Sequence, residues 1–133
     1  MSTRRTSNRQ LLKQLIHLIH TEMRDGHVTV SHLASTLNIS TSQLNRRVNQ
    51  AIGISASSFI MKVRLEAAKR LLLGDGRYDN RVSDVASRCG FADVSHFCHV
   101  FKRIYGITPL QFVRFNTKLV NFDELITSAV KDD

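Results

Sequence analysis

Two histidines and a cysteine lie within four consecutive positions of the stretch GFADVSHFCHVFKRIYGITPLQF, residues 90–112. Together with Cys89, the side chains of His96, Cys98 and His99 are of the types that bind zinc. Their spacing, Cys-x6-His-x-Cys-His, matches no established zinc pattern, and on a helix Cys98 and His99 would point about 100° apart. We therefore expect no metal site here, and these polar groups need another explanation.

Catalytic chemistry has still less support in the sequence. No nucleophile with a base and an orienting group stands out, and there is no glycine-rich phosphate loop and no pair of carboxylates among apolar residues. Acidic residues such as Glu66, Asp84 and Asp93 fit helix starts or surface charges. We expect a protein that is not an enzyme and that uses no cofactor.

The charge of the chain is strongly basic and unevenly distributed. The sequence has 19 Lys and Arg against 11 Asp and Glu, a formal net charge of +8. Residues 1–118 hold 18 basic and 7 acidic residues, a net charge of +11, whereas the last 15 residues are acidic. A domain with this charge attracts polyanions, so we expect nucleic acid as the partner before an acidic membrane.

The sequence also indicates a cytoplasmic location. The first ten residues are polar and basic with no apolar run behind them, and no segment approaches the roughly 18 consecutive apolar residues of a membrane span. Cys89 and Cys98 are the two cysteines and do not form a Cys-x-x-Cys motif, so reduced thiols are expected.

Two segments have the apolar spacing of helices. Residues 9–24 carry apolar side chains at intervals of three and four, after Ser7 and Asn8 as candidate N-caps and before Gly26. Residues 56–73 contain no helix breaker. One stripe of that segment consists of Phe59, Val63, Ala67 and Leu71. Alternation of period two is almost absent, so the expected fold class is all-α, with about seven short helices separated by glycines.

The chain contains the same pattern twice, in residues 30–60 and 82–113. Four residues recur at an offset of 52 and four more at an offset of 53, so one residue is added between the two halves of the second copy. The pairs are Val30 and Val82, Ser31 and Ser83, Ala34 and Ala86, Ser35 and Ser87, then Ser42 and Ser95, Gly53 and Gly106, Ile54 and Ile107, Phe59 and Phe112. A short helix with a small alanine, a tight turn at residues 38–40 or 90–93, and a second helix ended by glycine form the outline of a helix-turn-helix.

The second helix of each copy separates into two faces at 100° per residue. In residues 42–52 the expected buried stripe is Leu44, Val48, Ala51 and Ile52. The opposite face carries Ser42, Asn45, Arg46 and Asn49. Arginine can hold guanine O6 and N7 with two hydrogen bonds, and asparagine can hold adenine N6 and N7, so this face has the chemistry of base recognition.

In residues 94–105 the same division places the aromatic side chains inside and the histidines outside. The expected buried stripe is Phe97, Val100, Phe101 and Ile104. The outward positions are Ser95, His99 and Lys102, with Val94 and His96 near the helix start. The histidines of residues 90–112 are therefore expected to face a ligand or solvent instead of a metal ion.

Two segments resemble the DNA-binding unit of the AraC/XylS transcriptional regulators. RVSDVASRCGFADVSHFCHVFKRIYGITPLQF is similar to the signature region of that family, and LNISTSQLNRRVNQAIGISASSFIMKVRLEAAKRLL to the half that precedes it. The resemblance spans residues 8–115. Its second-half motif comprises Ala86, Gly90-Phe91, Phe97, Phe101-Lys102, Gly106 and Thr108-Pro109.

The resemblance implies seven helices in two helix-turn-helix subdomains, which are joined by a long linker helix and place each recognition helix in a major groove. The expected divisions are a basic arm or linker remnant at 1–8, an N-terminal subdomain at 9–54, a connecting helix at 55–74, a C-terminal subdomain at 75–117 and an acidic tail at 118–133. By position, the implied base contacts are Ser42, Asn45, Arg46, Val94, Ser95, His96 and His99. Phosphate contacts are expected from Arg47, Lys102 and Arg103.

The sequence leaves the wider role open among three hypotheses. The chain is a stand-alone activator that also contacts RNA polymerase, or it is the output domain of a larger regulator whose sensor or phosphorelay region lies N-terminal to it. The segment STSQLNRRVNQAIG resembles the DNA-binding ends of hybrid sensor-regulators and favours the second. The third hypothesis is a basic helical interaction module that binds nucleic acid or protein without sequence specificity.

Overall fold

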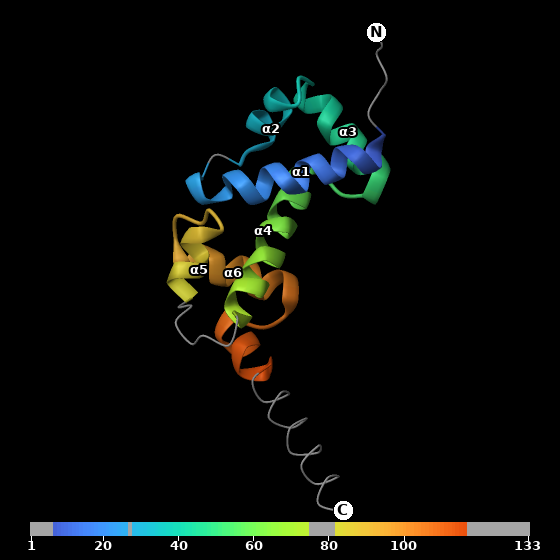
Figure 1. Cartoon of the computed structure of the whole chain (residues 1–133). Coiled ribbons are helices and arrows are strands. Elements are labelled where there is room, and N and C mark those ends of the chain that lie inside the picture. Colours follow the sequence, from blue (N-terminus) through green and yellow to red (C-terminus); the bar gives the residue numbers. More distant parts are fainter. Residues whose placement is uncertain (1–6, 27, 75–81, 117–133) are drawn as a thin grey trace, which may run out of the picture.

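The computed structural model describes residues 7–26, 28–74 and 82–116, and in these ranges every regular element is a helix (Figure 1). The order is α1 (Asn8–Glu22), the 3-10 helix η1 (Met23–Asp25), α2 (Val30–Thr36), α3 (Thr41–Ile52), α4 (Ala56–Leu73), α5 (Val82–Arg88) and α6 (Val94–Tyr105). A further helical segment covers residues 109–116. The predicted all-α class is confirmed. Most of the predicted arm at 1–8, the start of the predicted C-terminal subdomain at 75–81 and the tail at 118–133 lie outside the described residues.

The first helix begins and ends at local signals in the sequence. The Ser7 hydroxyl accepts a hydrogen bond from the Gln10 backbone N–H, and the Gln10 side chain accepts one from the Ser7 N–H, which together form a capping box. After η1 the chain turns at Gly26, whose φ is 74°. Leu11, Leu15 and Ile19 are buried along one side of α1, as the apolar spacing predicts.

The predicted repeat is present in the backbone as well as in the sequence. In the first unit, α2 to α3, the N–H of Asn38 donates to Ser35 O and the N–H of Ile39 to Ala34 O. In the second unit, α5 to α6, the N–H groups of Gly90 and Phe91 donate to Ser87 O and Ala86 O in the same way. We call the second helix of each unit, α3 or α6, its reading helix. The N-caps of these helices, Ser40 and Asp93, are 53 residues apart, whereas the turn residues before them pair at an offset of 52, so the added residue is Ala92.

The two alanines at equivalent positions of the repeat allow the helices of each unit to cross closely. Ala34 in α2 and Ala86 in α5 are each 1% exposed. A larger side chain at these positions would separate α2 from α3 and α5 from α6, because the interior is packed to near crystal density.

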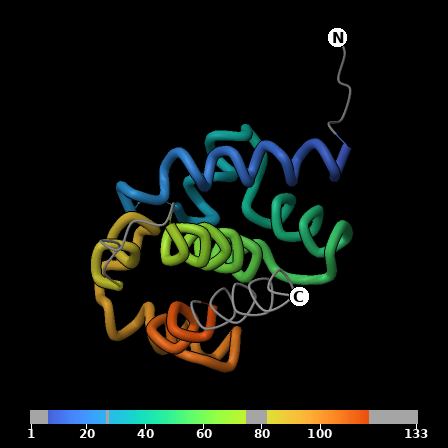
Figure 2. Tube along the Cα trace, turned by 60° about the horizontal axis from the view of Figure 1, so that its bottom comes forward, coloured from blue at the N-terminus to red at the C-terminus, as the bar shows by residue number. Residues whose placement is uncertain are grey.

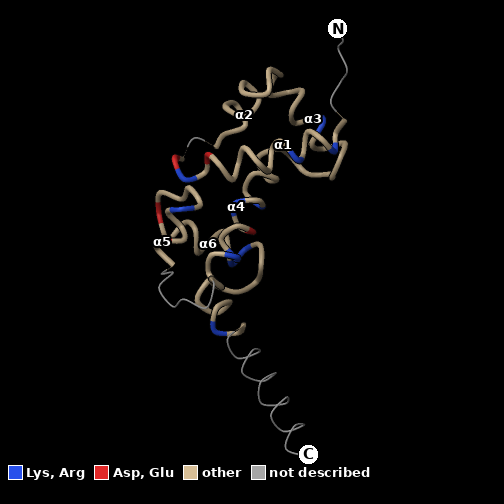
Figure 3. Tube along the Cα trace, viewed as in Figure 1, with Lys and Arg blue, Asp and Glu red and all other residues tan. Residues whose placement is uncertain are grey.

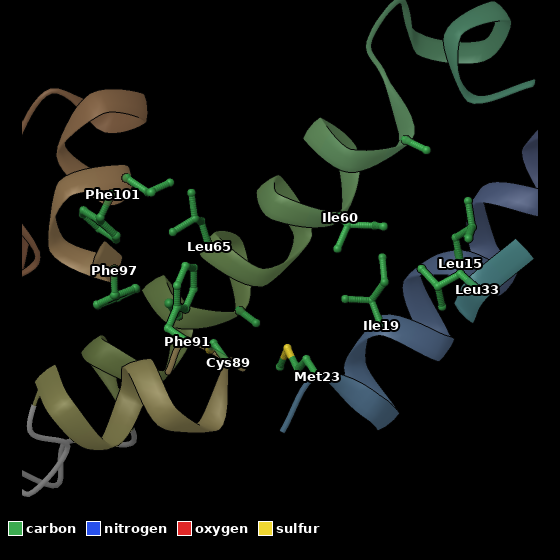
Figure 4. Close-up of a cluster of buried hydrophobic side chains, with 14 of the residues drawn as sticks. Leu15, Ile19, Met23, Leu33, Ile60, Leu65, Cys89, Phe91, Phe97 and Phe101 are labelled. Atoms are coloured by element: carbon green, nitrogen blue, oxygen red, sulfur yellow. The ribbon is translucent and has the colours of Figure 1, made fainter. Parts of the chain in front are cut away.

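The long helix α4 lies between the two units and contributes to the packing of both (Figures 1 and 2). In Figure 4, Ile60 points toward Ile19 of α1, while Leu65 lies beside Phe97 and Phe101 of α6. The buried residues of α4 are Ala56, Ile60, Leu65, Ala67, Ala68 and Leu72. Of the apolar stripe that the sequence shows, Ala67 is buried, while Phe59, Val63 and Leu71 are half-buried, and α4 buries residues beyond that stripe because it has partners on more than one side.

The second unit also contacts η1, the 3-10 helix that follows α1, directly at Gly90. A Cβ atom at this position would overlap the backbone carbonyl oxygen of Met23 in η1. Arg64 of α4 completes the junction: its Nε–H donates to Cys89 O at 2.7 Å, and its guanidinium lies 4.1 Å from the centroid of the Phe91 ring. The turn of the second unit is therefore fixed against η1 and α4 together.

We predict that Gly90→Ala destabilises the fold far more than Gly106→Ala does. Both glycines have a left-handed φ, 86° and 83°, which costs about 1–2 kcal/mol for alanine. Only Gly90 has a neighbour within reach of the added methyl group, which should add about 1–3 kcal/mol because η1 must move away. Urea unfolding measures both losses, and equal losses would show that the contact with Met23 does not constrain the turn.

Candidate nucleic-acid interface

The first reading helix, α3, presents the polar face that the periodicity predicts. Ser40 starts the helix by accepting a hydrogen bond from the Gln43 N–H at 3.0 Å, and Gly53 ends it at a φ of 74°. Leu44 and Val48 are fully buried against the neighbouring helices. The opposite positions are exposed: Ser42, Asn45, Arg46 and Asn49.

The apolar stripe of each reading helix is shorter than predicted. Ala51 and Ile52 of α3 were expected to be buried, but both are exposed, Ile52 to 43%. Ile104 of α6, which is equivalent to Ala51, is 39% exposed. In both units the chain reverses at a glycine directly after the helix, and the buried residue that follows the reversal, Ala56 or Pro109, closes the core at that end.

Two residues of α3 are bound to other parts of the protein. The Asn45 Oδ1 atom accepts a hydrogen bond from the Ala56 backbone N–H at 3.0 Å. Arg47 is half-buried, and its Nε–H donates to Asn8 Oδ1 at the start of α1, also at 3.0 Å. Arg46, in contrast, makes no hydrogen bond or ion pair within the described ranges, so its guanidinium is available to a ligand.

The outer face of α3 borders an open cleft of about 590 Å³. Its lining residues are Asn45, Arg46, Asn49, Gln50, Ser55 and Ser57. Sequence reasoning missed Gln50, Ser55 and Ser57 as part of this surface. The position of Ser55 two residues after the Gly53 reversal is the signal that could have placed the start of α4 beside α3.

The second reading helix, α6, has the predicted division of faces with different chemistry. Asp93 caps it by accepting a hydrogen bond from the Ser95 N–H at 2.8 Å. Phe97, Val100 and Phe101 are buried. The predicted contact residues are all exposed: Val94, Ser95, His96 and His99, followed by Lys102 and Arg103 in the last turn.

The cysteines beside these histidines are not arranged as ligands. Cys89 is buried and Cys98 half-buried, and neither forms a disulfide. Burial raises the pKa of the Cys89 thiol to about 11 and shifts that of Cys98 upward as well, so both stay protonated at neutral pH. In the described part of the chain, no three His, Cys, Asp or Glu side chains come together in a group that could hold a metal ion.

Basic residues occur on the helices that carry the candidate contacts. Figure 3 shows Lys and Arg along α3, α4 and α6; Asp and Glu lie mainly at the junction of α1 with η1 and in the α5 region, where basic residues also occur, and Glu66 is the acidic residue of α4. The arrangement favours an anionic ligand over the reading helices. None of the described helices combines the length and the apolar character that crossing a bilayer requires.

Comparisons with known proteins identify this architecture. A helix-turn-helix domain family matches residues 33–114. The transcriptional activator NphR of Rhodococcus sp is 33% identical over 98 residues, which are 74% of this chain and 28% of that protein. The C-terminal domain of the two-component response regulator yesN from Fusobacterium nucleatum is 32% identical with a TM-score of 0.65, over 76% of this chain and 96% of that one. A probable AraC family regulator from Rhodopseudomonas palustris is 25% identical with a TM-score of 0.62, over 77% and 94%.

The chain belongs to the AraC/XylS family of helix-turn-helix transcriptional regulators. The family match starts within α2 and ends in the helical segment at 109–116, so it includes both units and α4. The chain spans about a quarter of the length of the curated relatives that it matches.

In this AraC/XylS domain, α4 holds the second reading helix through a polar contact as well as an apolar one. The Tyr105 hydroxyl at the end of α6 donates a hydrogen bond to Glu66 Oε2 at 2.5 Å, and Lys69 Nζ lies 3.4 Å from the same oxygen. The hydrogen bond from Tyr105 holds the pKa of Glu66 below its usual value, with a smaller effect from Lys69. Burial and the same carboxylate raise the pKa of Tyr105.

We predict that Tyr105→Phe destabilises the domain by about 1 kcal/mol at pH 7, a modest loss because the Glu66 carboxylate is partly exposed. Since the folded pKa of Glu66 is lowered, this stabilisation is present above its unfolded pKa, about 4.3, and is lost as the pH falls through the folded value. Urea unfolding at pH 7 and pH 3 should therefore show a difference between the two chains that narrows in acid. The same loss at both pH values would contradict the charged contact.

Proposed function

We propose that this chain is the sequence-specific double-stranded DNA-binding part of a transcriptional regulator, which inserts α3 and α6 into successive major grooves on one face of the duplex. The observation that carries the proposal is that α3 and α6, the second helices of the two repeated units, are both capped and both have a buried apolar stripe opposite an exposed polar face. The function is binding, without catalysis or a cofactor, and it is exerted in the cytoplasm.

The length of α4 supports the binding of α3 and α6, as two recognition helices, to one duplex. Its 18 residues at 1.5 Å each are about 27 Å long, which suits recognition elements separated by one turn of B-DNA, roughly 34 Å. Because α4 packs against both units, their spacing is set by a rigid element. A flexible linker would leave the distance between the two half-sites undefined.

The two readers differ in the contacts that they offer. The proposed base contacts of α3 are Ser42, Asn45 and Arg46, and those of α6 are Val94, Ser95, His96 and His99. Arg46 can make two hydrogen bonds to guanine, whereas Val94 offers only apolar contact with a thymine methyl group and the histidines make single hydrogen bonds. We propose that α3 supplies most of the sequence discrimination. The second unit adds affinity and orientation because Lys102 and Arg103 contact DNA phosphates. In the first unit, Arg47 is the proposed phosphate contact.

For the wider role, we propose an output domain of a larger regulator, with a sensor or phosphorelay region N-terminal to it. The similarity to the C-terminal domain of a response regulator and the quarter of its relatives' length that the chain spans favour this role. The competing role is a stand-alone activator. Contact with RNA polymerase is part of the proposal in either role.

Selection of bound duplexes from a randomised pool tests the proposal. The unmodified chain should recover a site with two half-sites about one helical turn apart and should keep its preference against scrambled duplex at fixed salt. The alternative function, a basic module without sequence specificity, predicts salt-sensitive binding to any duplex and no enriched site. The outcome therefore separates the two.

Arg46→Ala should cost about 1–3 kcal/mol of binding free energy and relax the preference at one base pair, because a bidentate contact is lost. Its matched control is Lys102→Ala, which removes an exposed charge from the other reader. That variant should weaken all duplexes alike and lower the slope of log K against log salt by about one. Fluorescence anisotropy over a salt series measures both, and an Arg46→Ala effect shared evenly by all sequences would contradict base reading.

A further inference from the structure

The repeat allows the contacts of one unit to be compared with those of the other, position by position. At an offset of 53 residues, Asn45 of α3 corresponds to Cys98 of α6. The start of α4 corresponds to the helical segment at 109–116: Ser55 and Thr108 both accept a hydrogen bond from the N–H three residues later, and Ala56 corresponds to Pro109.

Asn45 meets a need that exists only in the first unit. Ala56 is the first residue of α4 and is 1% exposed, and its N–H has no partner within the helix. The Asn45 Oδ1 atom, 3.0 Å away, accepts that hydrogen bond. In the second unit the residue equivalent to Ala56 is the buried Pro109, which has no N–H, and the residue equivalent to Asn45 is the half-buried Cys98.

The hydrogen bond decides which way the side-chain amide of Asn45 is turned. Its oxygen must face the Ala56 N–H, since the amide nitrogen cannot accept a hydrogen bond. A bidentate contact with adenine uses the oxygen and the nitrogen of one asparagine together. Oδ1 has a second lone pair, but the bond to Ala56 fixes how the amide is turned. Asn45 can turn toward an adenine in another orientation only by leaving the Ala56 N–H without a partner, which is costly.

We propose that Asn45 is a positioning residue that fixes the reading helix α3 to the start of α4, and that it does not read a base by itself. This inference rests on the proposed function and narrows it: base reading in the first unit is assigned to Ser42 and Arg46. Leu44 and Val48 hold α3 on the core by apolar contacts, which are non-directional and leave small rotations of the helix open. The bond from Asn45 to Ala56 limits that rotation, together with the bond from Arg47 to Asn8, and therefore limits the direction of Arg46.

A cycle of three variants in the 133-residue chain tests the inference: Asn45→Ala, Ala56→Pro and the double variant, which reproduces the absence of the N–H in the second unit. Proline is compatible with the first position of a helix, and Ser55, with φ −70° and ψ 161°, has the extended conformation that a residue before proline adopts. Asn45→Cys combined with Ala56→Pro is the closest copy of the second unit.

Asn45→Ala should lower the thermal midpoint by about 3–6 °C, as the loss of one helix-start hydrogen bond does in a domain of this size. At a temperature where the variant is fully folded, its affinity for a duplex selected with the unmodified chain should fall roughly threefold to tenfold, evenly over the base pairs of the first half-site. Ala56→Pro alone should be less stable still, because the proline ring replaces the hydrogen that Asn45 binds. The double variant should recover most of the stability and of the affinity.

Three outcomes would overturn the inference. An unchanged thermal midpoint in Asn45→Ala would show that the bond does not support α3. A double variant that recovers stability but loses preference at a single base pair would show that Asn45 reads that base. Additive effects of the two substitutions would show that the residues are not coupled. If the unmodified chain selects no duplex at all, the proposed function fails. The thermal midpoints of the two single variants and the double variant still decide whether Asn45 and Ala56 act together.

Discussion

The arrangement of the two reading helices depends on the burial of α4 between them. This helix contributes Ile60 to the side that faces α1 and Leu65 to the side that faces α6 (Figure 4). Alanines at 67 and 68 are also buried, which lets neighbouring elements approach its backbone closely. Because the interior is densely packed, α4 cannot shift toward one unit without opening space beside the other. Because α4 packs against both units, side-chain packing fixes the separation of α3 and α6.

The parts of this fold that could be predicted from sequence are those set by neighbouring residues. The bounds of α4 and α6 agree with the periodicity because their caps are local: Ser55 and Asp93 start them, and glycines end them. The exposed positions of α3 and α6 follow from helical geometry alone. What sequence reasoning missed depends on contacts across the chain. Neither the partners of Asn45 and Arg47 nor the exposure of Ala51 could be predicted without knowing where α1 and α4 lie.

Helical periodicity was least reliable where a helix has more than one neighbour or reaches the end of a core. For α4 it predicts one apolar stripe, but the helix is covered on several sides, so Leu65 and Ala68 are buried while Phe59 and Val63 are only half-buried. For α6 it predicts a buried Ile104, although that side chain lies in the last turn before the reversal at Gly106. An amphipathic pattern reports which side of a helix is apolar, and the number of neighbours decides how much of it is covered.

The two units differ at the positions where one of them meets the rest of the protein. The turn of the first unit uses Asn38 in the left-handed region, at a φ of 59°, and asparagine tolerates that conformation in an open turn. The equivalent residue of the second unit is Gly90, where even a methyl group would overlap Met23. The same backbone conformation is thus needed twice, but the second copy must also admit η1 and the guanidinium of Arg64 above Phe91. Gly90 is therefore required by the contact of the second unit with η1, and this contact fixes the turn before α6 together with Arg64 of α4.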